Sequence, residues 1–179
     1  MKLVILDRDG VINFDSEHYI KSPAEWRPLP GAIEAIARLN QNGFRIAVAT
    51  NQSGIGRGLF DMATLNAIND KMMEMVFRQG GRIDALFFCP HTADEECGCR
   101  KPRTGMLEEI AARFHTELKG VPAIGDSLKD LQAAETVGAQ PILVLTGKGA
   151  KTRTEGGMPR KTLVFDDLAE ASRHLIAPA

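Results

Sequence analysis

The sequence predicts an α/β fold, a Rossmann-like doubly wound parallel sheet, from three observations. Short apolar runs alternate with segments whose apolar residues recur at helical spacing along the 179-residue chain. The runs are continuously apolar, as in parallel strands that are buried on both faces. Polar residues follow several runs directly, at the edge where open parallel sheets bind their ligands.

Six apolar runs predict strands, and they cover residues 3–6, 44–49, 83–88, 121–124, 142–145 and 163–165. Between them, apolar residues at helical spacing predict helices over residues 31–40, 61–79, 104–118, 127–137 and 166–176. We expect Asp61, Ser127 and Asp166 to cap three of these helices at their N-termini, and Gly80 and Gly138 to end two of them.

Two segments carry no clear periodicity. Residues 11–29 contain Pro23 and Pro28, and residues 146–161 are rich in Gly, Lys and Thr. Both are expected to be surface loops, and neither is long enough to form a separate domain. We therefore predict a single domain over residues 1–179.

Composition and charge argue against several classes of function. The chain has 22 basic and 23 acidic residues, a net charge of −1, and no polybasic arm, so nucleic acid is not an expected partner. Asp7 interrupts the first apolar run, which argues against a secretory signal, and no apolar stretch is long enough to cross a membrane. We expect a monomeric cytoplasmic protein that needs no membrane partner.

The first strand is followed directly by Asp7-Arg8-Asp9-Gly10. Residues i and i+2 of an extended chain point the same way, so the two carboxylates would lie together at the strand tip. They would repel each other unless a cation lies between them, and a divalent metal would leave one oxygen free as a nucleophile. The alternative is an acidic turn, because Asp and Gly are common in turns.

Polar groups follow the other strands as well, and they are Thr50-Asn51-Gln52-Ser53-Gly54 after the second, Arg100-Lys101-Pro102 after the third and Gly125-Asp126-Ser127 after the fourth. Each could be ordinary loop polarity, a helix cap or a solvated basic pair. Their joint position at one edge of the sheet instead favours phosphoryl transfer.

In such a site, Asp7, Asp9 and Asp126 can hold Mg²⁺, which prefers oxygen ligands. The Thr50 hydroxyl can bind phosphate oxygens, and Lys101 can stabilise the negative charge of the transition state. An aspartate nucleophile would form an aspartyl-phosphate, which water then hydrolyses.

With these groups the chain resembles a known superfamily, and the resemblance covers about two-thirds of its length. Its motifs match, in order, the four motifs of haloacid dehalogenase-like phosphatases, namely Asp7-x-Asp9-Gly10, Thr50-Asn51, Lys101-Pro102 and Gly125-Asp126-x-x-x-Asp130. Ordinary strand–helix units account for most of the residues between the motifs. A capless enzyme with an open site is therefore expected.

The resemblance also implies a role for each aspartate. Asp7 would be the nucleophile, Asp9 the general acid/base and Asp126 a metal ligand. Asp130 would be either a further metal ligand or a group that supports the ligands without touching the metal, and we favour the supporting role. Thr50 and Lys101 would hold the transferring phosphoryl group.

All three cysteines lie in one short segment together with a histidine, as Cys89-Pro90-His91 and Cys97-Gly98-Cys99. Three thiolates and one imidazole suit a tetrahedral structural zinc with no open position. Cysteines of a cytosolic chain indicate metal binding or free thiols rather than disulfides, and incidental thiols are the alternative here. The sequence thus predicts a zinc loop over residues 89–99.

The form Cys-x-His…Cys-x-Cys-Arg-Lys-Pro resembles the zinc loop of D-glycero-D-manno-heptose 1,7-bisphosphate 7-phosphatases and their histidinol-phosphatase relatives. In those enzymes the loop stands in for a cap beside the active site. The resemblance implies a Mg²⁺-dependent sugar phosphatase with a structural Zn²⁺. The expected reaction is removal of the 7-phosphate of heptose bisphosphate during ADP- or GDP-heptose synthesis for lipopolysaccharide or a surface glycan, and histidinol phosphate is the alternative substrate.

By the same resemblance, ten residues would line the sugar-phosphate pocket, namely Asp15, Ser16, Glu17, His18, Thr50, Asn51, Gln52, Ser53, Arg100 and Lys101. Arg100 is the candidate for holding the non-reacting phosphate, because a guanidinium binds phosphate oxygens in a fork. His18 could equally be an exposed loop histidine. The zinc loop is shorter than in many heptose phosphatases, so the substrate and its anomer are left open.

Two other functions share parts of this pattern. A phospho-accepting receiver domain also combines acids with Thr and Lys on a parallel sheet. Receivers, however, place the phosphorylated Asp after the third strand and have no zinc loop. A nucleic-acid 3′-phosphatase is disfavoured by the nearly neutral charge of the chain.

Overall fold

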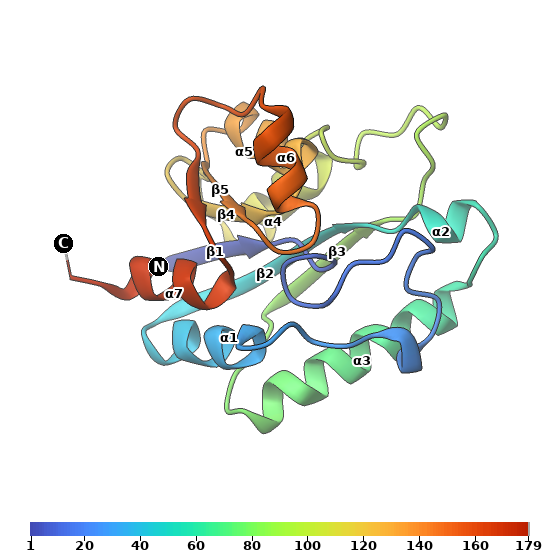
Figure 1. Ribbon diagram of the computed structural model, residues 1–179, viewed down its shortest axis with the longest axis horizontal. Helices are drawn as coiled ribbons and strands as arrows, with labels where there is room; N and C mark the ends of the chain where they lie inside the picture. The colour runs from blue at the N-terminus through green and yellow to red at the C-terminus, as the bar shows by residue number, and fades with distance from the viewer. Residues whose placement is uncertain (179) are drawn as a thin grey trace.

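The structure, a computed structural model that describes residues 1–178, is built on one parallel sheet (Figure 1). Its six strands lie in the order β3-β2-β1-β4-β5-β6. They are β1 (Lys2–Leu6), β2 (Phe44–Asn51), β3 (Ala85–Cys89), β4 (Pro122–Gly125), β5 (Gln140–Val144) and β6 (Leu163–Phe165). Each neighbouring pair is parallel, as predicted from the continuous apolar runs.

The strand order reverses beside β1, which lies between β2 and β4 at the centre of the sheet. Leu6, the last residue of β1, is level with Val48 of β2 and Ile124 of β4. The segments that follow these three strands therefore meet at one edge. Such a switch point is where doubly wound sheets bind their ligands.

Helices cover both faces of the sheet (Figure 1). They are α1 (Ala32–Gln41), α3 (Met62–Arg78) and α7 (Leu168–Ile176) on one face, and α4 (Gly105–Phe114) and α5 (Leu128–Thr136) on the other. Alternate residues of β1 point to opposite faces. Val4 and Leu6 belong to the core under α1 and α3, whereas Leu3 and Ile5 belong to the core under α4 and α5.

Three shorter helical elements complete the chain, namely η1 (Pro23–Glu25), α2 (Ser53–Gly56) and α6 (Gly149–Glu155). The position of α6 corrects the expectation that residues 146–161 form only a loop. In the described residues, η1 and α1 are the only helical elements between β1 and β2, and α2 and α3 are the only ones between β2 and β3. Neither connection therefore holds a cap domain. The capless doubly wound fold is thus confirmed.

Several element boundaries differ from the prediction. The third strand starts at Ala85 rather than residue 83 and extends to Cys89. Helix α4 ends at Phe114 instead of reaching residue 118, because His115 adopts a left-handed φ of 49° that cannot continue the helix. The cap of α7 is Asp167 rather than Asp166, and its side chain accepts a hydrogen bond from the Glu170 N–H at 2.8 Å.

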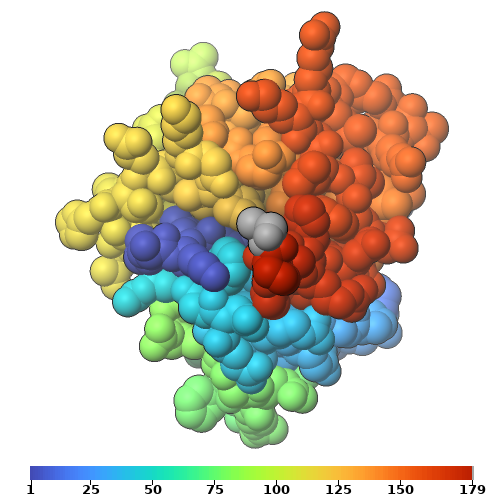
Figure 2. All heavy atoms as spheres, turned by 90° about the vertical axis from the view of Figure 1, so that its left-hand side faces the viewer, coloured from blue at the N-terminus to red at the C-terminus, as the bar shows by residue number. Residues whose placement is uncertain are grey.

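Both chain ends lie at the edge opposite the switch point. Figure 2 shows this end of the molecule, with the blue N-terminal residues and the red residues of α7 on one face. Among residues 1–178, no helix combines the length and the apolar character that a membrane span requires.

The α7 cap generates a prediction about stability. Asp167→Ala should lower the free energy of unfolding by about 1 kcal/mol, because it leaves the Glu170 N–H without its acceptor. Asp166→Ala is the matched control, since the side chain of Asp166 is exposed and does not cap the helix. Urea unfolding of both variants measures the difference, and an equal loss in the two variants would contradict the assignment of the cap.

Candidate active site and metal cluster

Three aspartates meet beside the switch point. Asp7 follows β1, Asp126 follows β4, and Asp130 lies in the first turn of α5. Each offers one carboxylate oxygen that lies within 4.8 Å of those of the other two. Three acidic side chains so close together repel one another unless positive charge lies among them, which makes this cluster a candidate cation site.

Asp126 is held in place by backbone that approaches it closely. Gly10 and Gly147 both adopt positive φ, and a Cβ on either would lie within 2.3 Å of the Asp126 carboxylate. The N–H of Lys148 donates to Asp126 Oδ2 at 2.8 Å, and the buried Thr152 hydroxyl donates to its backbone carbonyl. The segment around α6 therefore shapes the site, although the sequence suggested only a surface loop.

Lys101 supplies the positive charge within the protein. Its Nζ donates to Asp7 Oδ1 at 3.1 Å, to Asp130 Oδ1 at 2.6 Å and to the backbone carbonyl of Ala49 at 2.7 Å. All three N–H donors of the ammonium group thus have acceptors. Burial disfavours the charged form, but attraction to Asp130 and Asp7 outweighs it, and the pKa of Lys101 is raised.

One lysine does not balance three carboxylates. Burial and the nearby carboxylates raise the pKa of Asp7 to about 7 in spite of Lys101, and they raise the pKa of Asp126 to about 8. A divalent cation next to these two groups would favour their ionised forms. Since its ligands would be carboxylate oxygens and water, the donor set fits Mg²⁺.

Asp130 supports the other groups of the cluster through hydrogen bonds. Its Oδ2 accepts hydrogen bonds from the N–H groups of Asp126 and Ser127 and from the Ser127 hydroxyl, while its Oδ1 is paired with Lys101. Asp130 and Ser127 also form the capping box that starts α5. With these bonds made, the carboxylate is better suited to support Asp126 and Lys101 than to bind a metal.

The side chain of Asp9 lies outside the three-carboxylate cluster, so its binding of Mg²⁺ together with Asp7 and Asp126 stays a prediction. Its Oδ1 accepts from Arg8 Nε and Asn13 Nδ2, both at 2.9 Å, and its Oδ2 accepts from Gln52 Nε2 at 3.0 Å. Burial disfavours ionisation, but the Arg8 guanidinium and these hydrogen bonds outweigh it, and the pKa of Asp9 is lowered. These hydrogen bonds fix the orientation of the Asp9 carboxylate.

The residues after β2 differ in what their side chains do. Thr50 is 1% exposed, and its hydroxyl accepts a hydrogen bond from Gln52. The Asn51 amide binds both the N–H and the carbonyl of Lys101. Asn51 and Gln52 thus align Lys101, Asp9 and Thr50, in addition to lining the cavity where substrate binding was predicted.

A cavity of about 470 Å³ opens above these groups. Nine of the ten predicted pocket residues line it, and the exception is His18, which is exposed. This placement favours the alternative stated for His18, an exposed loop histidine. Its neighbour Tyr19 lines the cavity instead, and no sequence signal singled out this tyrosine.

Basic residues gather on one side of the cavity and include three lysines that the sequence did not single out, Lys129, Lys148 and Lys151. Burial lowers the pKa of Lys129, and the cations of Arg100 and Lys148 lower it further, which places these charges close together. Lys148 Nζ also forms a 3.5 Å ion pair with Asp15. Only the Lys-rich composition of residues 146–161 hinted at this basic side.

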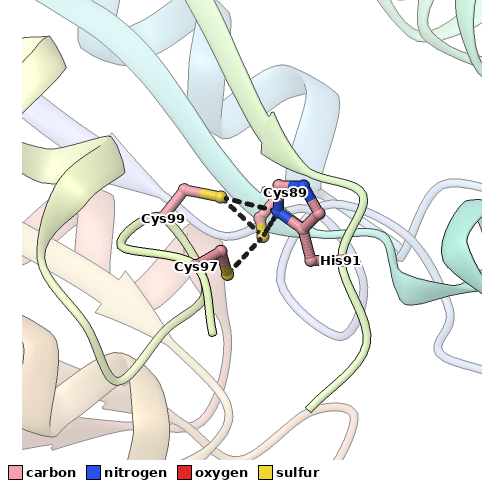
Figure 3. A group of neighbouring side chains, drawn as sticks. All are labelled: Cys89, His91, Cys97 and Cys99. Atoms are coloured by element: carbon pink, nitrogen blue, oxygen red, sulfur yellow. Dashed lines mark hydrogen bonds between the residues drawn. The ribbon is translucent and has the colours of Figure 1, made fainter. Parts of the chain in front are cut away.

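The second cluster contains all three cysteines. Figure 3 shows the side chains of Cys89, His91, Cys97 and Cys99 pointing toward one another at the end of β3 and in the loop that follows it. Cys89 Sγ lies 3.7 Å from Cys97 Sγ, 3.5 Å from His91 Nδ1 and only 2.8 Å from Cys99 Sγ, so the four donor atoms are packed at least as closely as zinc ligands. Ligands of a tetrahedral zinc, at about 2.3 Å from the metal, would be about 3.8 Å apart, so the donor set fits zinc.

This loop is joined directly to the active site. Cys89 contributes its carbonyl to the Gln52 N–H, and Pro90 contributes its carbonyl to the Gly56 N–H. Arg100 Nη1 donates to the carbonyl of His91, and Lys101 follows Arg100 in the chain. Ordering the loop therefore orders two of the cations of the active site.

Comparisons with known proteins agree with this geometry. A family model described as HAD-hydrolase-like matches residues 98–171, and one described as polynucleotide kinase 3 phosphatase matches residues 2–127. The D-glycero-beta-D-manno-heptose-1,7-bisphosphate 7-phosphatase of Bordetella bronchiseptica is 55% identical over 179 residues, with 100% of both chains covered. The protein of the same name from Pseudomonas putida is 54% identical and covers 98% of this chain and 100% of its own.

This chain belongs to the heptose 1,7-bisphosphate 7-phosphatase family of haloacid dehalogenase-like hydrolases. Solved structures of heptose bisphosphate phosphatases match the fold. The B. bronchiseptica enzyme, complexed with magnesium and phosphate, is 56% identical, covers 98% of each chain and has a TM-score of 0.97. The Burkholderia thailandensis enzyme is 50% identical, covers 99% of this chain and 100% of its own, and has a TM-score of 0.79.

The cysteine cluster predicts that a zinc ion holds the loop and, through it, the cations of this family's active site. Cys99→Ser should lose the zinc and lower kcat/KM by up to about 10²-fold, because a displacement of about 1 Å can cost that much. Asp94→Asn, an exposed change in the same loop, is the control. Elemental analysis and initial rates give the answer, and full activity in protein that contains no zinc would contradict it.

Proposed function

We propose that this protein is a Mg²⁺-dependent phosphatase that removes the 7-phosphate of D-glycero-D-manno-heptose 1,7-bisphosphate through an aspartyl-phosphate. The observation that carries the proposal is the Asp7 carboxylate at the switch point, paired with Lys101 and placed next to Asp126. Relatives at 49–55% identity that carry this activity in their names support the choice of substrate. The product would enter ADP- or GDP-heptose synthesis.

Asp7 acts as the nucleophile in the first step. Its Oδ1 is bound to Lys101, so Oδ2 is the oxygen that attacks phosphorus. A phosphorus–oxygen bond to Asp7 forms, the bond to the sugar oxygen breaks, and Asp9 gives that oxygen a proton. Lys101 and the Thr50 hydroxyl stabilise the negative charge on the transferring group.

Water completes the reaction in the second step. Asp9, which has lost its proton, takes one from a water molecule as that water attacks the phosphorus of the aspartyl-phosphate. Inorganic phosphate leaves and the Asp7 carboxylate is regenerated. Mg²⁺, which Asp7 and Asp126 would hold, would neutralise charge on the phosphate oxygens.

The basic side of the cavity would recognise the second phosphate. Arg100 lines the cavity and can present a guanidinium fork, and Lys129 and Lys148 add positive charge nearby. Zinc would have a structural role, since the Cys₃His set leaves no open coordination position. A cytoplasmic location and a monomeric state stay predictions.

Initial rates on a panel of substrates separate the proposed function from its rivals. The panel contains both anomers of heptose bisphosphate, histidinol phosphate and a 3′-phosphorylated oligonucleotide, the last because the polynucleotide kinase 3 phosphatase model matches residues 2–127. Heptose bisphosphate should give the highest kcat/KM. A higher value for either of the other two compounds would replace the proposed substrate.

Asp7→Asn should abolish turnover of heptose bisphosphate and leave the fold intact, because the amide cannot form the aspartyl-phosphate. Asp70→Asn, an exposed change on α3, is the matched control and should retain activity. Rates and circular dichroism are measured on fresh protein whose mass excludes deamidation. Wild-type turnover by Asp7→Asn would reject the mechanism.

Arg100→Ala should weaken kcat/KM for the bisphosphate more than for a matched heptose monophosphate. The expected gap is on the order of 1.5–3 kcal/mol, the range for hydrogen bonds to charged groups. Arg100 also binds the carbonyl of His91, so it could serve only to brace the zinc loop. In that case both substrates would lose activity equally, and parallel losses would remove Arg100 from substrate recognition.

A further inference from the structure

Arg8 is a buried charge within the first motif. Its side chain is fully buried, whereas that of Asp9 beside it is 22% exposed. Arg8 Nε donates to Asp9 Oδ1 at 2.9 Å, and Nη1 donates to Asn69 Oδ1 at 3.1 Å. A buried charge is costly unless it is paired and hydrogen-bonded, so these two contacts account for its tolerance.

Asn69 is a polar exception on an apolar helix face. It lies on the side of α3 that packs against the sheet, among Leu65, Ile68 and Met72, and it is 6% exposed. Nη2 of Arg8 has no hydrogen-bond partner among residues 1–178. The hydrogen bond to Asn69 is therefore what fixes the rotation of the planar Arg8 guanidinium beyond its Nε, the atom that binds Asp9.

The contacts of Asp9 identify its reactive oxygen. Oδ1 accepts two hydrogen bonds, from Arg8 and Asn13, which occupy both of its lone pairs. Oδ2 accepts one, from Gln52, and keeps one lone pair free. The proton that Asp9 transfers is thus carried on Oδ2, and Arg8, together with Asn13 and Gln52, determines which way this oxygen faces.

We propose that Asn69 is a positioning residue for the proton transfer, and that it acts through Arg8 to hold Asp9 Oδ2 toward the oxygen of the leaving group. The inference rests on the proposed function, in which Asp9 protonates that oxygen. Asn69 itself lies on α3 and touches neither substrate nor the three-carboxylate cluster. Its loss would leave Asp7 and Lys101 in place and misdirect only the acid.

A misdirected acid has a kinetic signature. A sugar alkoxide is a poor leaving group and needs the proton as the bond to phosphorus breaks, whereas p-nitrophenolate is stable without it. The value of kcat/KM reports the steps up to aspartyl-phosphate formation, before water attacks. Loss of positioning should therefore lower kcat/KM for heptose bisphosphate and spare p-nitrophenyl phosphate.

The test compares both substrates in Asn69→Leu, which keeps a similar volume and removes the acceptor for Arg8. We expect kcat/KM for heptose bisphosphate to fall on the order of 10–10²-fold, within the worth of a general acid, with p-nitrophenyl phosphate nearly unchanged. Asn66→Leu is the matched control, because it makes the same change at an exposed position of the same helix. It should leave both substrates unaffected.

Asp9→Asn separates failure of this inference from failure of the proposed function. If Asp9→Asn spares p-nitrophenyl phosphate but Asn69→Leu lowers both substrates in parallel, or neither, Asn69 serves only the core and the inference is overturned. If Asp9→Asn itself shows no dependence on the leaving group, the acid role of Asp9 is wrong, and the inference falls with it.

A second variant covers poor folding of Asn69→Leu. Arg8→Lys disrupts the same contact from its other end, because it keeps a positive charge beside Asp9 but lacks the planar fork that reaches both Asp9 and Asn69. It should show the same selective loss on heptose bisphosphate. Parallel losses on the two substrates in folded Arg8→Lys would overturn the proposal.

Discussion

The ammonium group of Lys101 is the interaction on which the rest of the site depends. It joins Asp7 after β1, the backbone of β2 at Ala49 and Asp130 in α5. Three elements that are distant in sequence thus share one buried cation. Removing it would leave the clustered carboxylates without their internal counter-charge, and for a buried pair such a loss is far more costly than for a surface ion pair.

The surroundings of Lys101 explain why an open site can still be ordered. Asn51 binds the backbone of Lys101, and the cysteine loop leads directly into it. On the opposite side, Gly10 and Gly147 allow two backbones to enclose Asp126. The contacts of Asn51, the cysteine loop and the two glycines therefore order the site in the absence of a cap domain.

The strands and the helices over most of their length could be predicted from the sequence, and so could the collection of the candidate catalytic groups at one edge of the sheet. Buried parallel strands carry continuous apolar runs, and the end of each run marks the edge where Asp7, Thr50 and Asp126 collect. A metal site in the cysteine segment could also be predicted from the sequence. Its candidate ligands lie within one short stretch, so no contact between distant segments is needed to recognise them.

Side-chain direction and long-range pairing were decided only by the tertiary structure. Asp9 is two residues from Asp7, yet Arg8, Asn13 and Gln52 hold its carboxylate outside the three-carboxylate cluster. Helix α6 was hidden by its Gly- and Lys-rich composition, and Lys148 reaches the cavity only because β5 lies next to β4. Sequence by itself determined which groups stand at the strand ends, since hydrophobic burial sets the strand pattern locally. Which of those groups face one another depended on hydrogen bonds between segments far apart in the chain, and no local pattern encodes them.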